Sequence, residues 1–474
     1  MTAPTIDERA LRALRAALQG QLYTPDDGAY DAARTPWQLH VEQRPAAVVM
    51  ATSAADVVAA VTFARTHDLA IAIQGTGHGA VVACDGGLLI NTALMQGVRI
   101  DPLARTAWLE AGVKWQAVLD AAHPLGLAPL LGSTPDVGAV GYSLGGGLGW
   151  LARKYGLAVD SVRAFDIVTA DGQLRHVTAA SDPELFWGVR GGGGNFGVVT
   201  AMEVELYPVA EVYGGNLYFP IAMARQVMLA YRRWITTLPD EWTTGVVLMH
   251  MPPDPALPEP LRGQSVVIVR GCYTGDAAAG EAWLRPMREL GGIIVDAFGP
   301  MLFRDVETIS NDPLAPLNIQ ARTEVLRDLS PETIDALIAV AGRPPESPLA
   351  FAEVRHVGGA VNRAPADSSA FGHRDMEFIL FLLAVVLDPA EDRAIDRYMR
   401  AAGAAIQPHQ TGQIYLNFLH DSDITPARVR AAFPPQTYAR LVALKDRYDP
   451  TNMFRFNRNI PPSATHGVEP VGAA

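Results

Sequence analysis

The sequence has little cysteine and no long apolar run. Cys84 and Cys272 are the only cysteines among 474 residues and lie far apart, so a disulfide framework and a CxxC redox pair are both excluded. No run reaches the roughly 18 apolar residues that a membrane-spanning helix needs. The first residues mix charges into a helical period, unlike the apolar core of a signal peptide. We therefore expect a cytoplasmic protein with reduced thiols and no membrane partner.

Positive charge is also scarce. The chain has 38 basic and 50 acidic residues, a formal net charge of −12, and its lysines are limited to Lys114, Lys154 and Lys445. Polyanions are repelled on average by such a surface, so nucleic acid is not an expected partner. With 49% apolar and 19% charged residues, global disorder is excluded. The length suggests about two or three domains.

Glycine, in contrast, is concentrated in three clusters, at residues 75–79, 145–149 and 191–197. Backbone without a Cβ can approach a ligand closely and direct consecutive N–H groups at an anion. Three such loops in the first half of the chain predict a large phosphate-bearing cofactor. Ordinary turn glycines are the alternative for any single cluster.

Two catalytic-looking matches are rejected on context. Residues 192–197 match G-x-G-x-x-G, but a helical pattern precedes them and a strand pattern follows, the reverse of a nicotinamide-binding Rossmann unit. Residues 141–145 match G-x-S-x-G, but the nucleophile elbow of a serine hydrolase needs a buried strand directly before the serine and a helix directly after it. Neither a nicotinamide site nor a serine hydrolase is expected.

The first glycine cluster ends a predicted β-α-β unit. A strand at 48–50, a helix begun by Ser53 and a strand at 69–73 lead into Gly75-Thr76-Gly77-His78-Gly79. A histidine flanked by glycines is not expected in a core and has no metal-ligand spacing, so no metal site is predicted. A solvated loop histidine is the alternative to a functional one. After residue 214, strands alternate with grouped helices and predict an α+β second domain with a mostly antiparallel sheet.

Four motifs in order carry a family resemblance. They are GTGHG at 75–79, GSTPDVGAVGYSLGGG at 132–147, PELFWGVRGGGGNFGVVT at 183–200 and YDPTNMFRFNRNIPP at 448–462. This order resembles the berberine-bridge-enzyme-like FAD-linked oxidases of the vanillyl-alcohol-oxidase/PCMH superfamily, in the bacterial branch near 6-hydroxy-D-nicotine oxidase. Residues 211–410 share only the layout.

The resemblance implies an α+β, two-domain, PCMH-type FAD-binding fold. Its expected parts are an N-terminal helical segment (1–40), the FAD-binding domain (41–210), a substrate domain with a mostly antiparallel sheet covered by helices (211–432), a C-terminal segment completing the FAD domain (433–462) and a loose tail (463–474).

The resemblance also implies FAD held by one covalent link, from His78 to the flavin 8α-methyl carbon. Many relatives have a second link through a cysteine at the position of Thr134, and often an arginine at Gln74, so this chain departs from them at both. The remaining FAD-binding positions that it implies are Gly75, Thr76, Gly77, Gly79, Pro135, Val137, Gly138, Gly141, Tyr142, Ser143, Gly145, Gly146, Asn195, Gly197, Val199, Asn457 and Asn459. Val137 matches the position that controls dioxygen access, and valine there indicates an oxidase.

Flavin oxidation needs a base near the substrate. Tyr415 matches a family tyrosine that faces the flavin, and we expect it to act as base or substrate orienter; a tyrosine filling the domain interface is the alternative. Glu353, on a predicted strand before Gly358-Gly359, is the second candidate, against a solvated edge carboxylate paired with Arg355 or Arg374. Period-two alternation puts His356 on the opposite face from Glu353. Tyr142 and His373 are further possible pocket residues.

The predicted function is a FAD-dependent oxidase that takes a hydride from a C–O or C–N carbon of a small organic molecule, with dioxygen as oxidant and hydrogen peroxide as product. The alternatives are a dehydrogenase or oxidative cyclase acting on a bacterial secondary metabolite, and a non-catalytic flavin-binding protein. The sequence specifies neither the substrate nor the oligomeric state.

Overall fold

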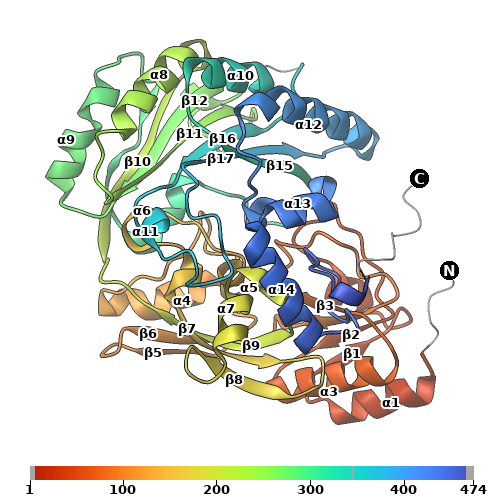
Figure 1. Cartoon of the computed structure of the whole chain (residues 1–474). Helices are drawn as coiled ribbons and strands as arrows, with labels where there is room; N and C mark the ends of the chain where they lie inside the picture. Colours follow the sequence, from red (N-terminus) through yellow and green to blue (C-terminus); the bar gives the residue numbers. More distant parts are fainter. Residues whose placement is uncertain (1–5, 343–345, 466–474) are drawn as a thin grey trace.

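The computed structural model describes residues 6–342 and 346–465, which form three sheets (Figure 1). Two smaller sheets lie in the lower half of Figure 1, and a larger sheet lies in the upper half. Of the tail expected at 463–474, Ser463–Thr465 form a short 3-10 helix, and residues 466–474 lie outside the described part. Within the described ranges, no helix combines the length and apolarity needed to cross a bilayer.

The first sheet contains the predicted β-α-β unit. β2 (Ala47–Met50) leads through α3 (Ala54–Thr66) to β3 (Ile71–Gln74), and β4 (Leu88–Asn91) lies parallel between the two strands. The Ser53 side chain caps α3, as expected, by accepting a hydrogen bond from the Asp56 N–H. The glycine loop 75–79 therefore leaves the sheet at the carboxyl end of β3.

The N-terminal segment is not purely helical. α1 (Glu8–Ala17) packs against α3, and α2 (Tyr30–Arg34) follows, but β1 (Gln21–Tyr23) between them pairs antiparallel with β2. Residues 21–23 of this segment thus belong to the first sheet. Three residues are too few for an alternating pattern, which is why the sequence did not reveal this strand.

The second sheet is antiparallel, with the order β5 (Val98–Asp101), β6 (Thr106–Glu110), β9 (Val198–Glu205), β7 (Val162–Val168), β8 (Leu174–Thr178). Asp171-Gly172 forms the β7–β8 turn, with Gly172 at a φ of +80°. Between β6 and β9 the chain also forms helices α4 (Trp115–Ala122), α5 (Ala139–Leu144), α6 (Ala152–Tyr155) and α7 (Pro183–Gly192). Two of the predicted glycine clusters flank α5 and α7.

The large sheet is antiparallel, as expected for the substrate domain. Its main strands, in spatial order, are β10 (Glu211–Pro220), β12 (Ser265–Tyr273), β11 (Trp242–His250), β16 (Phe351–His356), β17 (Phe378–Val385) and β15 (Ile319–Leu326), and β13 (Val295–Asp296) and β14 (Gly299–Leu302) pair with β10. Helices α8 (Ala224–Ile235), α9 (Ala277–Arg288), α10 (Pro331–Ala341) and α12 (Asp392–Ile406) cover its upper face (Figure 1). The lower face points toward the other two sheets.

Neither β15 nor α12 was predicted from the sequence. β15 alternates polar residues with its apolar ones, and several of these polar side chains are buried with partners. Glu324, for example, pairs with Arg428 at 3.2 Å, and Gln320 donates to Asp392 at 2.6 Å. A strand whose polar side chains are satisfied by distant segments shows no simple alternation of apolar and solvated positions.

The C-terminal segment returns to the lower half. After α13 (Pro426–Ala431), α14 (Pro435–Tyr448) packs against α7. Lys445, fully buried, donates to the Asn195 carbonyl at 2.8 Å, to Asp449 at 2.7 Å and to the Phe454 carbonyl at 3.1 Å. This ammonium group fastens the segment to the third glycine cluster.

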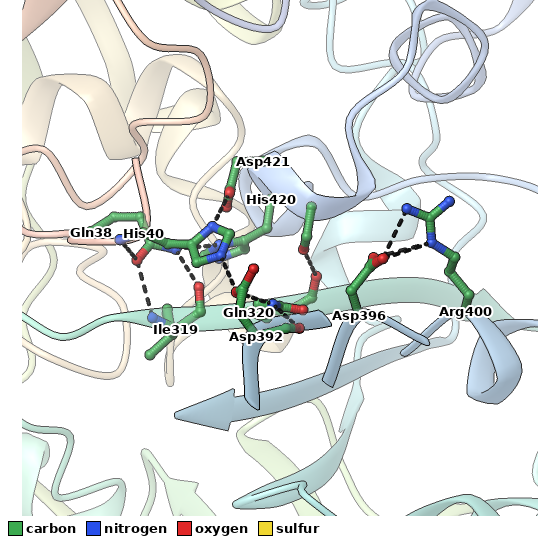
Figure 2. A network of polar contacts seen from close by, with 11 residues as sticks. Gln38, His40, Ile319, Gln320, Asp392, Asp396, Arg400, His420 and Asp421 are labelled. Atoms are coloured by element: carbon green, nitrogen blue, oxygen red, sulfur yellow. Dashed lines mark hydrogen bonds and ion pairs between the residues drawn. The ribbon is translucent and has the colours of Figure 1, made fainter. Parts of the chain in front are cut away.

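A polar junction joins the two halves (Figure 2). His40 Nδ1 lies 2.5 Å from Asp421 and its Nε2 lies 2.7 Å from Asp392, at the start of α12. Hydrogen bonds to these carboxylates raise the pKa of His40 to about 9, against the opposing effect of burial, so the ring is a cation at neutral pH. Gln38 bonds the main chain of Ile319 beside it. The N-terminal segment, α12 and the loop that carries Asp421 therefore meet at one charged group.

Candidate functional site

A cavity of about 950 Å³ lies between the glycine loops of the lower half and the inner face of the large sheet. All three predicted glycine clusters contribute residues to its lower wall, and β10, β11, β12, β16 and β17 contribute side chains to its upper wall. A cavity of this size is large enough for a dinucleotide together with a small molecule.

His78 lies on the lower wall and is more buried than a glycine-flanked loop residue suggests. Its ring stacks on Trp37 with centroids 4.4 Å apart, and its Nδ1 lies 2.8 Å from Thr76 Oγ1. Nε2 is buried and has no hydrogen-bond partner among the described residues. Burial lowers the pKa of His78 to about 4, although the charge of Asp136 opposes this, so the imidazole is neutral at pH 7.

Around His78 the lower wall is mostly main chain. A Cβ added at Gly141 or at Gly193 would meet no other atom within 4 Å, although both residues line the cavity. Side chains at these positions would therefore project into open cavity space. Gly193 also has a φ of +63°, which favours glycine. The wall leaves room for a ligand to contact the backbone directly.

Amide and guanidinium groups of the C-terminal segment close one side of the cavity. Asn457 donates to the Gly194 carbonyl at 3.3 Å, and the Asn195 side chain donates to the Arg458 carbonyl at 3.2 Å. Arg458 donates to the Leu419 carbonyl at 2.7 Å, and burial lowers its pKa to about 10. These contacts hold the segment against the third glycine cluster.

Most of the predicted FAD-binding residues line this cavity. They are Gln74, Gly75, Thr76, Gly77, Gly79, Thr134, Val137, Gly138, Gly141, Tyr142, Gly145, Asn195, Gly197, Val199 and Asn457, together with His78. Gln74, where relatives often have arginine, is neutral and buried, and accepts a hydrogen bond from Gln43 at 2.9 Å.

Four predicted positions do not line it: Pro135, Ser143, Gly146 and Asn459. Ser143 lies inside α5 and donates to the Ala139 carbonyl at 2.8 Å, which also argues against a nucleophile elbow. A Cβ on Gly146 would meet the rings of Phe371 and Tyr415, so this glycine serves packing behind the wall. The spacing of residues along the sequence does not show which of them face the cavity and which pack behind its wall.

Tyr415 is likewise behind the wall. It is 1% exposed, and its hydroxyl accepts a hydrogen bond from the Leu148 N–H at 2.9 Å. Burial raises its pKa to about 12, the opposite of the lowered pKa expected for a base. His373, the other uncertain pocket residue, bonds the Ala431 carbonyl at 2.9 Å and also does not line the cavity. This placement favours the alternative reading of Tyr415, an interface-filling residue.

Glu353 does line the cavity, but it is not an edge carboxylate. β16 is an interior strand, and Glu353 is completely buried between Arg270 and Arg355. Arg270 donates to Oε1 through two nitrogens, and Arg355 Nε lies 3.0 Å from Oε2. Burial by itself would raise the pKa of Glu353, but the two guanidinium groups lower it below its ordinary value. Arg374, the other partner considered, binds Asp160 instead.

Comparisons with known proteins identify this arrangement. Residues 45–178 match the model of an FAD binding domain, and residues 414–461 match the model described as berberine and berberine like. The chain is thus an FAD-linked oxidoreductase that is similar, over these two segments, to the berberine-bridge-enzyme-like proteins. Its fold is the PCMH-type α+β fold that the sequence predicted, and its cofactor is FAD.

Two curated relatives match almost the whole chain. The (R)-6-hydroxynicotine oxidase of Paenarthrobacter nicotinovorans is 28% identical over 95% of this chain and 98% of its own. The chitooligosaccharide oxidase of Gibberella zeae is 26% identical over 94% and 92%. Among solved structures, 6-hydroxy-D-nicotine oxidase from Arthrobacter nicotinovorans superposes with a TM-score of 0.83 at 26% identity, covering 94% of this chain and 98% of that one.

The lower wall fits FAD in this oxidoreductase. The open space over Gly141 and Gly193 leaves the backbone accessible, and the unpartnered Nε2 of His78 is available to a ligand. The helix-loop-strand order around 192–197 is also observed, since α7 precedes and β9 follows, so the rejected Rossmann reading is excluded by the structure.

Several cavity residues escaped the sequence analysis, chiefly Trp37, Arg270, Asn417, His420 and Arg458. Trp37 and Arg270 lie in segments where the motif match is weak, and nothing in their local sequence marks them. Asn417, in contrast, lies two residues after the predicted Tyr415, and Arg458 directly follows the predicted Asn457 in the motif at 448–462. The chosen Asn457 also lines the cavity, whereas the chosen Tyr415 does not.

Proposed function

We propose that this protein is an oxidase that removes a hydride from a C–O or C–N carbon of a small organic molecule and transfers the electrons to dioxygen, giving hydrogen peroxide. The observation that carries the proposal is the single cavity that joins a backbone-lined FAD wall to a wall bearing buried charged side chains. FAD, when bound, supplies a two-electron acceptor for the hydride.

We also propose that His78 carries the single covalent link to FAD. A neutral imidazole has a lone pair available for bond formation, and His78 Nε2 has no hydrogen-bond partner among the described residues, its nearest carboxylate oxygen being that of Asp136 at 3.9 Å. A second link would need a nearby thiol. Thr134 occupies the position where many relatives have cysteine, and Cys84 and Cys272 are both buried and do not line the cavity.

We propose that side chains of the upper wall orient the substrate. Of the two predicted catalytic residues, Glu353 lines the cavity and Tyr415 does not. Glu353 is ionised at neutral pH because its pKa is lowered, so it is able to accept a hydrogen bond from a substrate O–H or N–H. Val137, the position that the family resemblance connects with dioxygen access, also lines the cavity and supports the oxidase over the dehydrogenase.

The covalent link is tested by acid precipitation and intact mass. We expect the yellow colour to stay in the pellet and the polypeptide to gain the mass of one FAD. His78→Ala should release its colour to the supernatant and show the bare polypeptide mass. If the wild-type protein also shows the mass of the bare polypeptide, the covalent assignment is wrong. If the purified wild-type protein contains no flavin before precipitation, the whole proposal is contradicted.

A second experiment tests whether dioxygen is the oxidant. Alcohols, cyclic amines, sugars and aromatic acids are first screened without oxygen for compounds that bleach the bound flavin. Enzyme reduced by a bleaching compound should regain its colour in air and release peroxide stoichiometrically. If it stays colourless in air for minutes while an artificial acceptor restores the colour, the protein is a dehydrogenase or an oxidative cyclase. A compound set that bleaches nothing while FAD remains bound favours the non-catalytic flavin-binding alternative.

A further inference from the structure

The strand register gathers charge at one point of the upper wall. Gly245 on β11 is paired with Arg270 on one side and with Arg355 on the other, and the next inward pair on β11 and β16 is Val247 with Glu353. The two guanidinium groups therefore flank a position without a side chain. Their common partner, the Glu353 carboxylate, reaches from the adjacent row of the sheet.

Gly245 provides the space for this cluster. A Cβ at residue 245 would lie 3.4 Å from Glu353 Oε1, 3.2 Å from the Val354 carbonyl oxygen and 3.9 Å from Arg270 Cγ. Any larger side chain would occupy the space that the ion pairs use. Because Gly245 has no side chain, the long charged side chains of Arg270, Glu353 and Arg355 converge over the middle of this interior strand.

The cluster has more positive than negative charge. Glu353 is 1% exposed in its side chain and is shared by Arg270 and Arg355, so two cations share one anion in direct contact. Arg355 donates no hydrogen bond to another described residue beyond its ion pair with Glu353. Its guanidinium carbon lies 5.0 Å from the Phe418 ring centroid, and that of Arg270 lies 5.8 Å from the Trp150 centroid.

Other carboxylates near the cavity do not neutralise the excess positive charge of this cluster. Asp312 lines the cavity and raises the pKa of Arg355 by its charge, but it is partly exposed and forms no ion pair with a described residue. Asp254 lines the same cavity and is exposed. Water solvates both carboxylates, whereas Arg270 is buried and the Arg355 side chain is only 16% exposed, so both guanidinium groups have lost most of their hydration and favour an added anion.

Most side chains next to the cluster on the upper wall are apolar or aromatic, and Asn216 and His250 add polar groups farther along β10 and β11. The side chains around the cluster include Tyr218, Val247, Ile268, Phe351, Phe381 and Leu383. A sugar would leave many hydroxyl groups without partners against such a surface. An aromatic or aliphatic body would instead replace water at apolar surface.

We propose that Arg355, supported by Arg270 and Glu353, binds the acidic group of the substrate, and that the substrate is an apolar or aromatic molecule carrying one carboxylate or a similar monoanion. This inference rests on the proposed function because it assigns the substrate of that same cavity. The FAD-binding glycine loops lie on the opposite wall, so the cluster is available for the second ligand.

The first test measures ligand preference in the flavin-loaded enzyme. Benzoate, benzamide and benzamidine have the same ring and are anionic, neutral and cationic at neutral pH. Each is titrated while the absorbance of the bound flavin is followed. We expect benzoate to bind at least about tenfold more tightly than benzamide, because charge-assisted hydrogen bonds are the stronger kind, and benzamidine to bind most weakly. Equal affinities, or a preference for benzamidine, would overturn the proposal without any variant.

The second test uses matched variants in the loaded enzyme. Arg355→Gln should remove the preference for benzoate over benzamide, and Arg355→Lys should keep part of it. Arg225→Gln, which alters a surface pair with Asp335, serves as the control and should change nothing. Flavin content and reduction potential are measured on each. If Arg355→Gln shifts the flavin potential but leaves the benzoate preference intact, the charge serves the cofactor and the proposal is wrong.

The two proposals fail separately. A chain that binds no FAD contradicts the proposed function before any ligand is added. A chain that binds FAD, reacts with dioxygen and shows no anion preference keeps the proposed function and loses only the acidic substrate.

Discussion

The two walls of the cavity present different kinds of atoms. The lower wall offers main chain, with open space over Gly141 and Gly193, whereas the upper wall offers long side chains joined in ion pairs around Glu353. A backbone wall needs only glycine at the right spacing, and spacing is visible along the chain. A side-chain wall needs several strands in register, and those strands are scattered over more than a hundred residues. The difference explains why one wall was predicted in detail and the other in outline.

Filling the lower wall should have the largest effect. In Gly141→Leu the new side chain meets no protein atom at its Cβ and occupies the space assigned to FAD. We expect flavin content, measured from the visible absorbance of the purified protein, to fall by at least about tenfold, with the fold retained. Gly28→Leu, at another glycine with open space around its Cβ but away from the cavity, is the control. Normal flavin content in Gly141→Leu would show that this glycine does not face the cofactor.

Breaking the charged cluster of the upper wall comes next. Glu353→Gln removes the anion shared by two buried guanidinium groups, and we expect the free energy of unfolding to fall by about 3 kcal/mol. The same change at an exposed pair, Glu8→Gln beside Arg12, should cost less than about 1 kcal/mol. Chemical denaturation of both variants measures the contrast. Equal losses would mean that the buried cluster is no more important to stability than a surface pair.

A third variant, Tyr415→Phe, distinguishes a structural role of Tyr415 from a catalytic one. Tyr415→Phe leaves the buried Leu148 N–H without its acceptor, which should cost about 1–3 kcal/mol of stability. Because the hydroxyl does not reach the cavity, we expect kcat to change by less than about tenfold and the pH profile of kcat to keep its shape, whereas loss of a general base costs about 100-fold or more. A large loss of kcat at unchanged stability would restore Tyr415 as the base.

The smallest effect concerns the junction between the halves. The pKa of His40 is raised from its ordinary 6.5 to about 9, so its stabilising charge is fully present below pH 6.5 and is lost as the pH rises through 9. We expect the free energy of unfolding to decline over that range by about 1–2 kcal/mol more than in His40→Gln. Parallel pH dependences in the two proteins would show that the bonds to Asp392 and Asp421 contribute nothing.

Sequence reasoning was accurate where function depends on local backbone. The strand-helix-strand unit, the glycine loops and the placement of His78 beside a large cavity follow from residues that are neighbours in the chain. It was less accurate where a side chain can face either way. Asn457 was selected and lines the cavity, but Tyr415 and Asn459 were also selected and do not, whereas the nearby Asn417 and Arg458 do.

Periodicity, glycine spacing and motif order are properties of a linear chain, and they were enough to predict the fold class, the cofactor-binding loops and the departure at Thr134. In contrast, the enclosure of Glu353 by Arg270 and Arg355, the room that Gly245 leaves for them and the charge of His40 between two aspartates could be seen only in the folded chain. These groups are brought together from distant segments. Their charges and pKa values depend on burial and on partners that no stretch of sequence contains.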